Sequence, residues 1–289
     1  MSKKKKGIYK PLFALGIVIL LIGAIIALYG YYPTITGYIN RGSTEQSSMP
    51  SISTNAIQKL DVNLPSAGEV DCIVVFTAKT GVSALGQQAS MKSMISSLSG
   101  TIKDQYVLAI NAMNIIVDAE KLSDIANNDQ VAYIYPNRKD ITLLDDGITW
   151  DNFIHFMDNG RGILQVDELH TQGIRGDGVT VFVMDSGVNP DHPDLQRNGN
   201  SVVVDSVNPA GYVYSMDHGT AVAGCIASQN PDYLGVAPEC DIFSINVFDP
   251  DGNGQTAWIL KGIEVISGYH REHPNGYIIS TNSWGVSHT

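Results

Sequence analysis

Residues 178–195 read GVTVFVMDSGVNPDHPDL, and this stretch decides the fold. Its first half, Gly178–Met184, is an almost uninterrupted apolar run, which is typical of a strand buried on both faces of a parallel sheet. The run leads directly into Asp185, Ser186 and Gly187. An acidic residue that follows such a strand lies at the edge of an α/β sheet where ligands bind, although an Asp before Ser-Gly more often only forms a turn. The stretch therefore predicts an α/β fold and makes Asp185 a candidate functional residue.

A second stretch carries a histidine. Residues 217–228 read DHGTAVAGCIAS, so His218 and Gly219 open a helix built largely from small residues. Such a helix packs closely against a sheet and would hold His218 at its N-terminal end. An isolated histidine is more often a structural residue, but this one begins a helix that a sheet can accommodate. His218 is therefore a second candidate functional residue.

These two stretches resemble the catalytic-aspartate and catalytic-histidine motifs of the subtilisin-like serine proteases, or subtilases. The resemblance implies that Asp185 orients the imidazole of His218 and fixes its tautomer. It also implies that His218 acts first as general base and then as general acid. The implied activity is that of a serine endopeptidase, which acts on peptide or protein substrates and requires no cofactor.

Three later stretches follow in the order of the family: LGVAP at 234–238, FDPDGNGQTAWI at 248–259 and ISTNSWG at 279–285. In the family, parts of the last two flank the substrate and pair with its backbone as an added strand, for which glycines allow a close approach. Turn glycines in a surface loop are the alternative. The substrate-binding residues that the resemblance implies are Gly252, Asn253, Gly254, Ser283, Trp284 and Gly285.

The segment 71–142 has the pattern of a small separate domain. Its predicted elements follow the ferredoxin-like βαββαβ order. They are a strand at Cys72–Phe76, a helix at Val82–Leu98, strands at Tyr106–Ile110 and Met113–Val117 joined by a tight turn at Asn111-Ala112, a helix at Glu120–Ala126 and a strand at Val131–Tyr135. From these residues alone, a free-standing adaptor module is an open alternative.

The resemblance gives this domain a meaning, because subtilases commonly carry a ferredoxin-like propeptide that assists folding and caps the cleft until it is removed. It implies a propeptide at 71–144 that contacts the catalytic domain of the same chain. Ile141–Leu144 would lie extended in the cleft, and the processing point would fall between Asn137 and Trp150. The catalytic domain would then occupy residues 145–289.

The N-terminus predicts a membrane segment. Leu12–Tyr32 carries no charge and as a helix would be about 31 Å long, close to the thickness of a bilayer core. Five of the 18 basic residues lie in the first ten positions, which should keep residues 1–10 in the cytoplasm. We expect a retained single-pass signal anchor at 11–32 and a linker at 33–70, with everything that follows outside the cytoplasm. A cleaved signal peptide and a secreted protein are the alternative.

Composition excludes several classes of function. The 289 residues include 18 Lys and Arg against 29 Asp and Glu, a net charge of −11, and no acidic residue precedes Glu45. The acidic body repels phosphate backbones, so we expect no nucleic-acid partner. Cys72, Cys225 and Cys240 are too few for a disulfide framework and lack the spacing of a zinc site. Buried free thiols are expected, with a Cys225–Cys240 bridge as the alternative.

The nucleophile of the family is missing from this sequence. Neither its motif, Gly-Thr-Ser-x-Ala-x-Pro, nor the later asparagine that donates to the oxyanion occurs between residues 1 and 289. A general base without an alcohol to activate forms no acyl-enzyme, and neither Ser186 nor Ser283 is expected to substitute. We therefore expect an inactive N-terminal part of a longer membrane-anchored precursor, with an incomplete subtilisin-like parallel sheet and flanking helices. The alternative is a pseudoprotease or a membrane-tethered inhibitor.

Calcium is the one metal that the sequence leaves open. Asp194 matches a family position that often contributes to a structural calcium site, but Ser228–Leu234, which would supply the other ligands, is shorter than the usual loop. Asp249, Asp251 and Asn253 alternate as ligands do, but they fall in the cleft loop, where capping of a turn is the stronger expectation.

Overall fold

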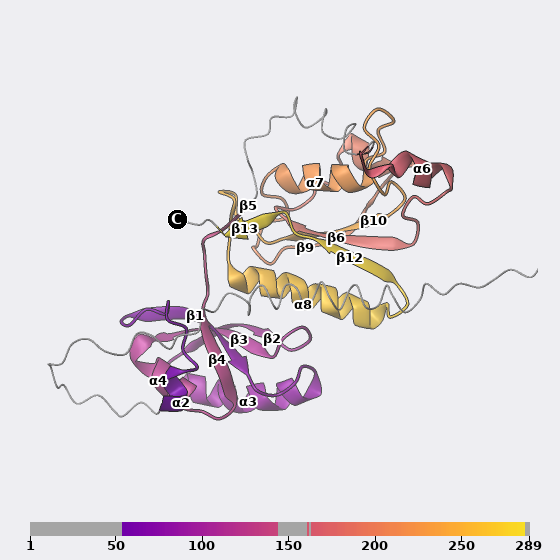
Figure 1. Ribbon diagram of the computed structural model, residues 1–289. Coiled ribbons are helices and arrows are strands. Elements are labelled where there is room, and N and C mark those ends of the chain that lie inside the picture. Colours follow the sequence, from indigo (N-terminus) through magenta and orange to yellow (C-terminus); the bar gives the residue numbers. More distant parts are fainter. Residues whose placement is uncertain (1–53, 144–160, 162, 287–289) are drawn as a thin grey trace, which may run out of the picture. The chain divides into compact units, whose positions relative to one another are not determined.

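The computed structural model describes residues 54–143, 161 and 163–286 (Figure 1). All of them belong to one compact unit, Ser51–Thr289. The predicted membrane segment Leu12–Tyr32 and most of the predicted linker lie outside the described residues. Within the described ranges, no helix is long and apolar enough to cross a membrane.

The first part of this unit is an antiparallel sheet with two helices. Its strand order is β2-β3-β1-β4, so the first strand lies in the middle, as in a ferredoxin-like arrangement. Buried side chains such as Met91, Ile95 and Ile125 on the helices pack against Val74 and Ile115 on the strands. The elements are β1 (Glu69–Phe76), α3 (Val82–Ser97), β2 (Thr101–Tyr106), β3 (Ala112–Asp118), η1 (Ala119–Lys121), α4 (Leu122–Ala126) and β4 (Val131–Pro136).

The predicted position of the hairpin was wrong. The second strand was expected at Tyr106–Ile110, but β2 ends at Tyr106, and residues 107–111 form the connection to β3. β2 is an edge strand whose side chains alternate between exposed and partly buried positions, so it contains no continuous apolar run. The apolar run at 107–110 belongs instead to a loop whose backbone N–H groups bond to Glu264.

The predicted linker also contributes to this sheet. The short helix α2 (Thr54–Ile57) precedes Leu60, which forms an isolated parallel bridge with Ile134. Ala56 is buried in the same apolar cluster, and Leu60 and Leu64 pack against it. The polar composition of the range 33–70 predicted a linker throughout. Its second half instead contains a short helix and apolar residues that pack on the sheet.

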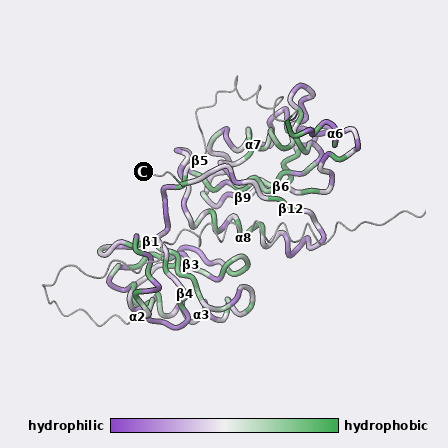
Figure 2. The backbone as a smooth tube through the Cα atoms, in the orientation of Figure 1, coloured by the Kyte–Doolittle hydropathy of each residue, from purple (hydrophilic) through white to green (hydrophobic). Residues whose placement is uncertain are grey.

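The second part is a parallel sheet of order β12-β6-β10-β9. Alternate side chains of the central strand β6 pack on opposite faces, which fits its predominantly green trace in Figure 2. Val181 and Val183 face the cluster that contains α7, whereas Phe182 and Met184 face the cluster that contains α8. Accordingly, α7 and α8 cover opposite sides of the sheet (Figure 1). The mixed α/β architecture with a parallel sheet agrees with the prediction.

The helices and strands of this second part have the following bounds: β5 (Ile141–Leu143), α6 (Val166–Thr171), β6 (Val179–Asp185), η2 (Pro193–Leu195), β7 (Gln196–Arg197), β8 (Asn200–Ser201), β9 (Val203–Val207), α7 (His218–Ala227), β10 (Asp241–Asn246), β11 (Asn253–Gly254), α8 (Thr256–Glu272), β12 (Tyr277–Thr281) and β13 (Trp284–Val286). The helix α8 approaches β6 closely, since a side chain at Gly262 would lie 2.5 Å from Met184 Sδ.

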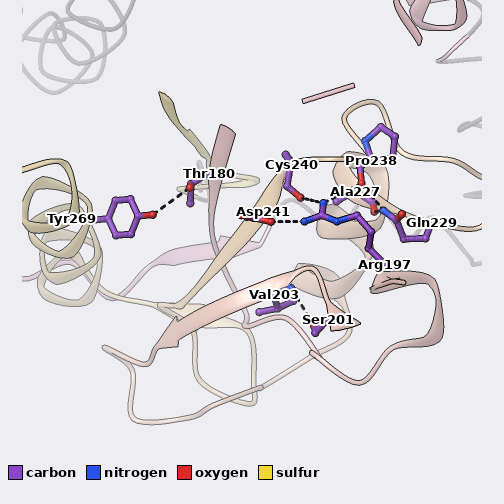
Figure 3. A network of polar contacts seen from close by, with 10 residues as sticks. All are labelled: Thr180, Arg197, Ser201, Val203, Ala227, Gln229, Pro238, Cys240, Asp241 and Tyr269. Carbon is purple, nitrogen blue, oxygen red and sulfur yellow. Dashed lines mark hydrogen bonds and ion pairs between the residues drawn. The ribbon is translucent and has the colours of Figure 1, made fainter. Parts of the chain in front are cut away.

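Arg197 fixes the chain ahead of β10 (Figure 3). Its guanidinium donates to the carbonyls of Pro238 and Cys240 and forms an ion pair with Asp241 at 2.6 Å. Gln229 Nε2 donates to the same Pro238 carbonyl at 2.6 Å. These contacts hold the start of β10 and the turn before it to the loop that carries Arg197.

All three cysteines lie in the described part of the chain, and none forms a disulfide there. Cys72 and Cys240 are buried as predicted, whereas Cys225 is only partly buried. Burial raises the pKa of Cys72 to about 12 and those of Cys225 and Cys240 to about 11. All three are therefore thiols, not thiolates, at neutral pH.

Candidate active site

Asp185 is the last residue of β6, and its side chain is buried at the carboxyl edge of the sheet. Its neighbour across the parallel ladder is Asn246 at the end of β10. Asp185 Oδ1 accepts two hydrogen bonds, from the backbone N–H of Ser186 at 2.7 Å and from Nδ1 of His218 at 2.8 Å. The strand end therefore presents one carboxylate oxygen to the histidine.

His218 is the first residue of α7, and 19% of its side chain is exposed. Because Nδ1 faces Asp185, the buried carboxylate favours the tautomer that carries its proton on that nitrogen. The structure brings together two side chains that are separated by 33 positions in the sequence. Such a couple stabilises an imidazolium when the other ring nitrogen takes up a proton.

Gly219 makes this close approach possible. A Cβ atom at this position would collide with the carbonyl oxygen of Gly187 and would lie 3.1 Å from Asp185 Oδ1. Gly187 itself has φ +88°, which disfavours other residues. Sequence reasoning did not single out either glycine as part of the site. Their positions could have indicated them, because Gly219 directly follows His218 and Gly187 lies two positions after Asp185.

Beside the couple, three short strands form a second small sheet of order β11-β5-β13. The predicted tail therefore lies extended between the two predicted groove segments, and Leu144 falls outside the described residues. The antiparallel pairs are Asn253 with Thr142, Gly254 with Ile141, Trp284 with Leu143, Gly285 with Thr142, and Val286 with Ile141. Among the described pairs, Ser283 takes part in none.

Ile141 on β5 packs into an apolar cluster of the second part. This side chain is only 6% exposed and belongs to a buried cluster with Phe248 and Ile259. A side chain at Gly254 would lie 2.8 Å from the ring of Phe248, so glycine is required there. Gly252, with φ +78°, forms no strand pair but faces Leu143, whose Cδ1 lies 3.8 Å from the position of an added Cβ.

The wall of the groove is tied to the strand that carries Asp185. The indole Nε1 of Trp284 donates to the carbonyl of Met184 at 3.0 Å. The parallel pairing of β12 with β6 ends one residue earlier, at Thr281 with Val183. Trp284 therefore supplies a donor for a carbonyl beyond the end of that ladder.

A second set of contacts joins the ferredoxin-like part to α8, and sequence reasoning did not find it. Glu264 accepts from the backbone N–H groups of residues 107, 108 and 109 at 2.5 to 2.8 Å. The hydroxyl of Tyr106 donates to the carbonyl of Ala257 at 3.0 Å. Burial, followed by the nearby carboxylates of Asp104 and Asp71, raises the pKa of Tyr106.

The first turn of α8 is capped from outside the helix. Asn137 Oδ1 accepts from the N–H of Ala257 at 2.9 Å, and the carbonyl of Arg138 accepts from the N–H of Thr256 at 3.0 Å. The residue at the N-cap position, Gln255, caps no described N–H with its own side chain. The N-terminus of α8 thus takes its acceptors from the chain that leads into β5.

Asp194, the candidate calcium ligand, contacts the loop that follows α7. Its Oδ1 accepts from Nδ2 of Asn230 at 3.3 Å, and the amide of Asn230 is fixed because its oxygen accepts from Asp232 N. The described residues contain no group of three or more His, Cys, Asp or Glu side chains that could hold a metal ion. Asp249 caps a turn, as predicted, by accepting from Asp251 N and Asn253 N.

Comparison with known proteins assigns a family to this site. Residues 176–289 match the family model described as the Subtilase family. The chain is 34% identical over 202 residues to subtilisin E of Bacillus subtilis (strain 168), covering 69% of this chain and 49% of that protein. It is 31% identical over 216 residues to subtilisin J of Geobacillus stearothermophilus, covering 74% and 53%.

The minor extracellular protease Vpr of Bacillus subtilis (strain 168) is a more distant relative, 25% identical over 207 residues, with 65% of this chain and 25% of that protein covered. The chain spans about half the length of the subtilisins that it matches. The matched segment contains both members of the Asp185–His218 couple and both walls of the groove. Through residues 176–289, this chain belongs to the subtilase family.

Proposed function

We propose that this chain carries the acid–base couple and the peptide groove of a subtilisin-like serine endopeptidase. The observation that supports the proposal most strongly is the 2.8 Å contact between Asp185 Oδ1 and His218 Nδ1 at the edge of the sheet. With its tautomer fixed, His218 would take a proton from a serine hydroxyl and later deliver it to the leaving amine. Asp185 would stabilise the imidazolium that forms between these two steps.

The substrate would be a peptide or protein segment that binds as an added strand. We assign backbone pairing to Asn253 and Gly254 on one wall and to Trp284 and Gly285 on the other, because these residues pair with β5 in the present chain. Main-chain pairing supplies affinity, and pockets for alternate side chains supply selectivity. The apolar cluster around Ile141 favours an apolar side chain at the position that pairs with Gly254. Gly252 and Ser283 would complete the two segments.

The ferredoxin-like part would act as a propeptide in the same chain. β5 already fills the groove, so a substrate must compete with it. The contacts on α8 would hold this part in place independently of the groove. The precursor would become accessible to substrate only after the chain is cut beyond β5 and the ferredoxin-like part leaves.

Hydrolysis would require a serine nucleophile in the same polypeptide, and residues 1–289 do not contain the family motif. The test is to read the coding sequence beyond codon 289 and express its product with and without His218→Ala. We expect cleavage between residues 137 and 150, seen by mass spectrometry, in the parent and none in His218→Ala. The control is His170→Ala. His170 lies on α6 and contacts the carbonyl of Val236, so the protein with this change should be cleaved normally. Unchanged cleavage in His218→Ala would contradict the proposal.

A pseudoprotease or tethered inhibitor is the second candidate. It is favoured by the groove being filled by the chain's own β5 and by the additional contacts on α8. In this case the coding sequence should end without the serine motif, and the chain should fold and inhibit an added subtilisin without being cut. Rapid degradation of the chain by that subtilisin would argue against this candidate.

We further propose that Leu12–Tyr32 anchors the protein in a membrane, with the groove outside the cytoplasm. The support is the uncharged apolar span behind a basic cluster. The chain should stay with the membrane pellet after alkaline carbonate extraction, and protease added to intact cells should remove the part that follows the span. Release into the supernatant would favour a secreted protein.

A further inference from the structure

Ser186 uses all of its backbone and side-chain polar groups in the immediate neighbourhood of the couple. Its N–H donates to Asp185 Oδ1 at 2.7 Å, and its carbonyl accepts from Ser215 N at 2.8 Å. Its hydroxyl donates to the carbonyl of Met216 and accepts from the N–H of Gly219, each at 3.0 Å. The residue is fully buried. A hydroxyl whose proton is already bonded to a carbonyl is poorly suited to act as a nucleophile.

The same hydroxyl caps the helix that carries the histidine. Asp217, at the N-cap position of α7, caps no described N–H of the helix and instead accepts from the hydroxyl of Tyr214. The N–H of Gly219 belongs to the first turn, where helices leave donors unsatisfied. Ser186 fills this place from the end of β6, as an N-cap side chain normally would from within the helix.

The two hydrogen bonds of the Ser186 hydroxyl join backbone groups on either side of His218. Met216 lies two positions before the histidine and Gly219 one position after it, so the backbone on both sides is held by one oxygen. Because the N–H of Ser186 also bonds to Asp185, a single residue contacts the carboxylate and both flanks of the imidazole-bearing segment. Loss of the hydroxyl would leave the first turn of α7 free to move relative to Asp185.

We propose that Ser186 is a positioning residue that sets the separation between Asp185 and His218, by capping α7 with its hydroxyl while its N–H holds the carboxylate. The proposal rests on the proposed acid–base role of the couple. Ser186 contacts no reacting atom and acts only through the other two residues.

The test is Ser186→Ala in the full chain, read out by the proton on His218 Nδ1. In histidine-labelled protein we expect this proton to exchange slowly with solvent, because it is bonded to a buried carboxylate. Since a buried donor and acceptor lose their partner, exchange should accelerate about tenfold or more in Ser186→Ala. Ser186→Cys fills the same space with a weaker donor and acceptor and should give an intermediate rate, which keeps the test valid if the alanine variant does not fold.

Thr220→Val is the matched control. Thr220 is nearly as buried, lies in the same helical turn, and accepts from Asn189 N through its hydroxyl at 3.0 Å without touching the couple. A purely structural role for Ser186 predicts similar melting temperatures for Ser186→Ala and Thr220→Val, and an unchanged His218 proton in both. That result would overturn the proposal. Failure of the proposed function would show separately, as the absence of His218-dependent cleavage in the longer product.

Discussion

The groove and the outer surface of α8 both hold the ferredoxin-like part of the chain, but they use different interactions. The groove binds β5 through backbone pairs and one buried apolar side chain, Ile141. The surface of α8 binds a folded loop through side chains, chiefly Glu264 and the contact with Tyr106. Backbone pairing accepts many extended sequences, whereas the α8 contacts require the correct loop geometry. Under the proposed function, the groove would therefore bind peptides of many sequences, whereas the α8 contacts would be specific for this domain.

The largest expected effect is on the groove. Ile141→Asp places a charge in a buried apolar cluster, which should cost about 3 kcal/mol or more and release β5 from the groove. Amide exchange at positions 141 and 143 should accelerate by about a hundredfold or more. Thr142→Asp, whose side chain points to the other face of the strand, is the control and should change exchange only slightly. Full protection of β5 in Ile141→Asp would show that α8 alone holds the segment in place.

Glu264→Ala tests the other side of the comparison. The three N–H groups of residues 107–109 lose their charged acceptor, so docking should weaken by about 2 kcal/mol, and exchange at these amides should rise about thirtyfold. Glu272→Ala, an exposed residue at the end of the same helix, should have no such effect. If amides in β5 are released as fully as those in the loop, the two contact regions act as one unit.

Tyr106→Phe should lower the free energy of unfolding by about 1 kcal/mol near neutral pH, because the bond to the Ala257 carbonyl is lost. Since burial raises the pKa of Tyr106 above its ordinary value of 10.0, the folded protein keeps this proton where the unfolded chain loses it. This part of the stability is complete below about pH 10 and is lost as the pH rises further.

Urea unfolding of the parent and Tyr106→Phe at about pH 8 and about pH 11 checks this sign. The advantage of the parent should shrink at the higher pH. Tyr277→Phe, which changes an exposed tyrosine on β12, should track the parent at both. A constant difference between the parent and Tyr106→Phe would contradict the assignment.

The smallest effect is expected for Trp284→Phe. An aromatic ring remains, although it is smaller than the indole, and the bond to the Met184 carbonyl is lost, which should cost about 0.5 kcal/mol because the site is only half-buried. Trp258→Phe, in the same apolar cluster, is the control. A lower melting temperature for Trp284→Phe than for Trp258→Phe would support a separate contribution of this bond to the groove wall.

The central elements could be predicted from the sequence because their causes are local. The apolar run of β6 and the small residues of α7 fix both the strand and the helix, and they place Asp185 and His218 at adjoining ends. The extended segment at Ile141 was implied by the family resemblance alone. Each of these features depends on a pattern of residues that are adjacent in the sequence.

The rest depends on contacts between distant segments. Nothing near residues 107–110 indicates that their N–H groups bond to Glu264, so an apolar loop was taken for a strand. The role of Ser186 depends on where α7 begins in space, and the amide of Asn230 that faces Asp194 comes from a separate loop. Side-chain hydrogen bonds of this kind leave no periodic pattern in the sequence.

The first N–H groups of α8 bond to acceptors on Asn137 and Arg138, so the stability of this first turn depends on the segment that follows the ferredoxin-like sheet. If the proposed processing removes Asn137 and Arg138, the N–H groups of Thr256 and Ala257 would lose these acceptors and bond to water, which favours fraying of the first turn. Gly254 lies two residues before Thr256, so one wall of the groove would loosen at the same moment. After such processing, the empty groove would be more flexible than the filled one, and its width could adjust to the peptide that binds.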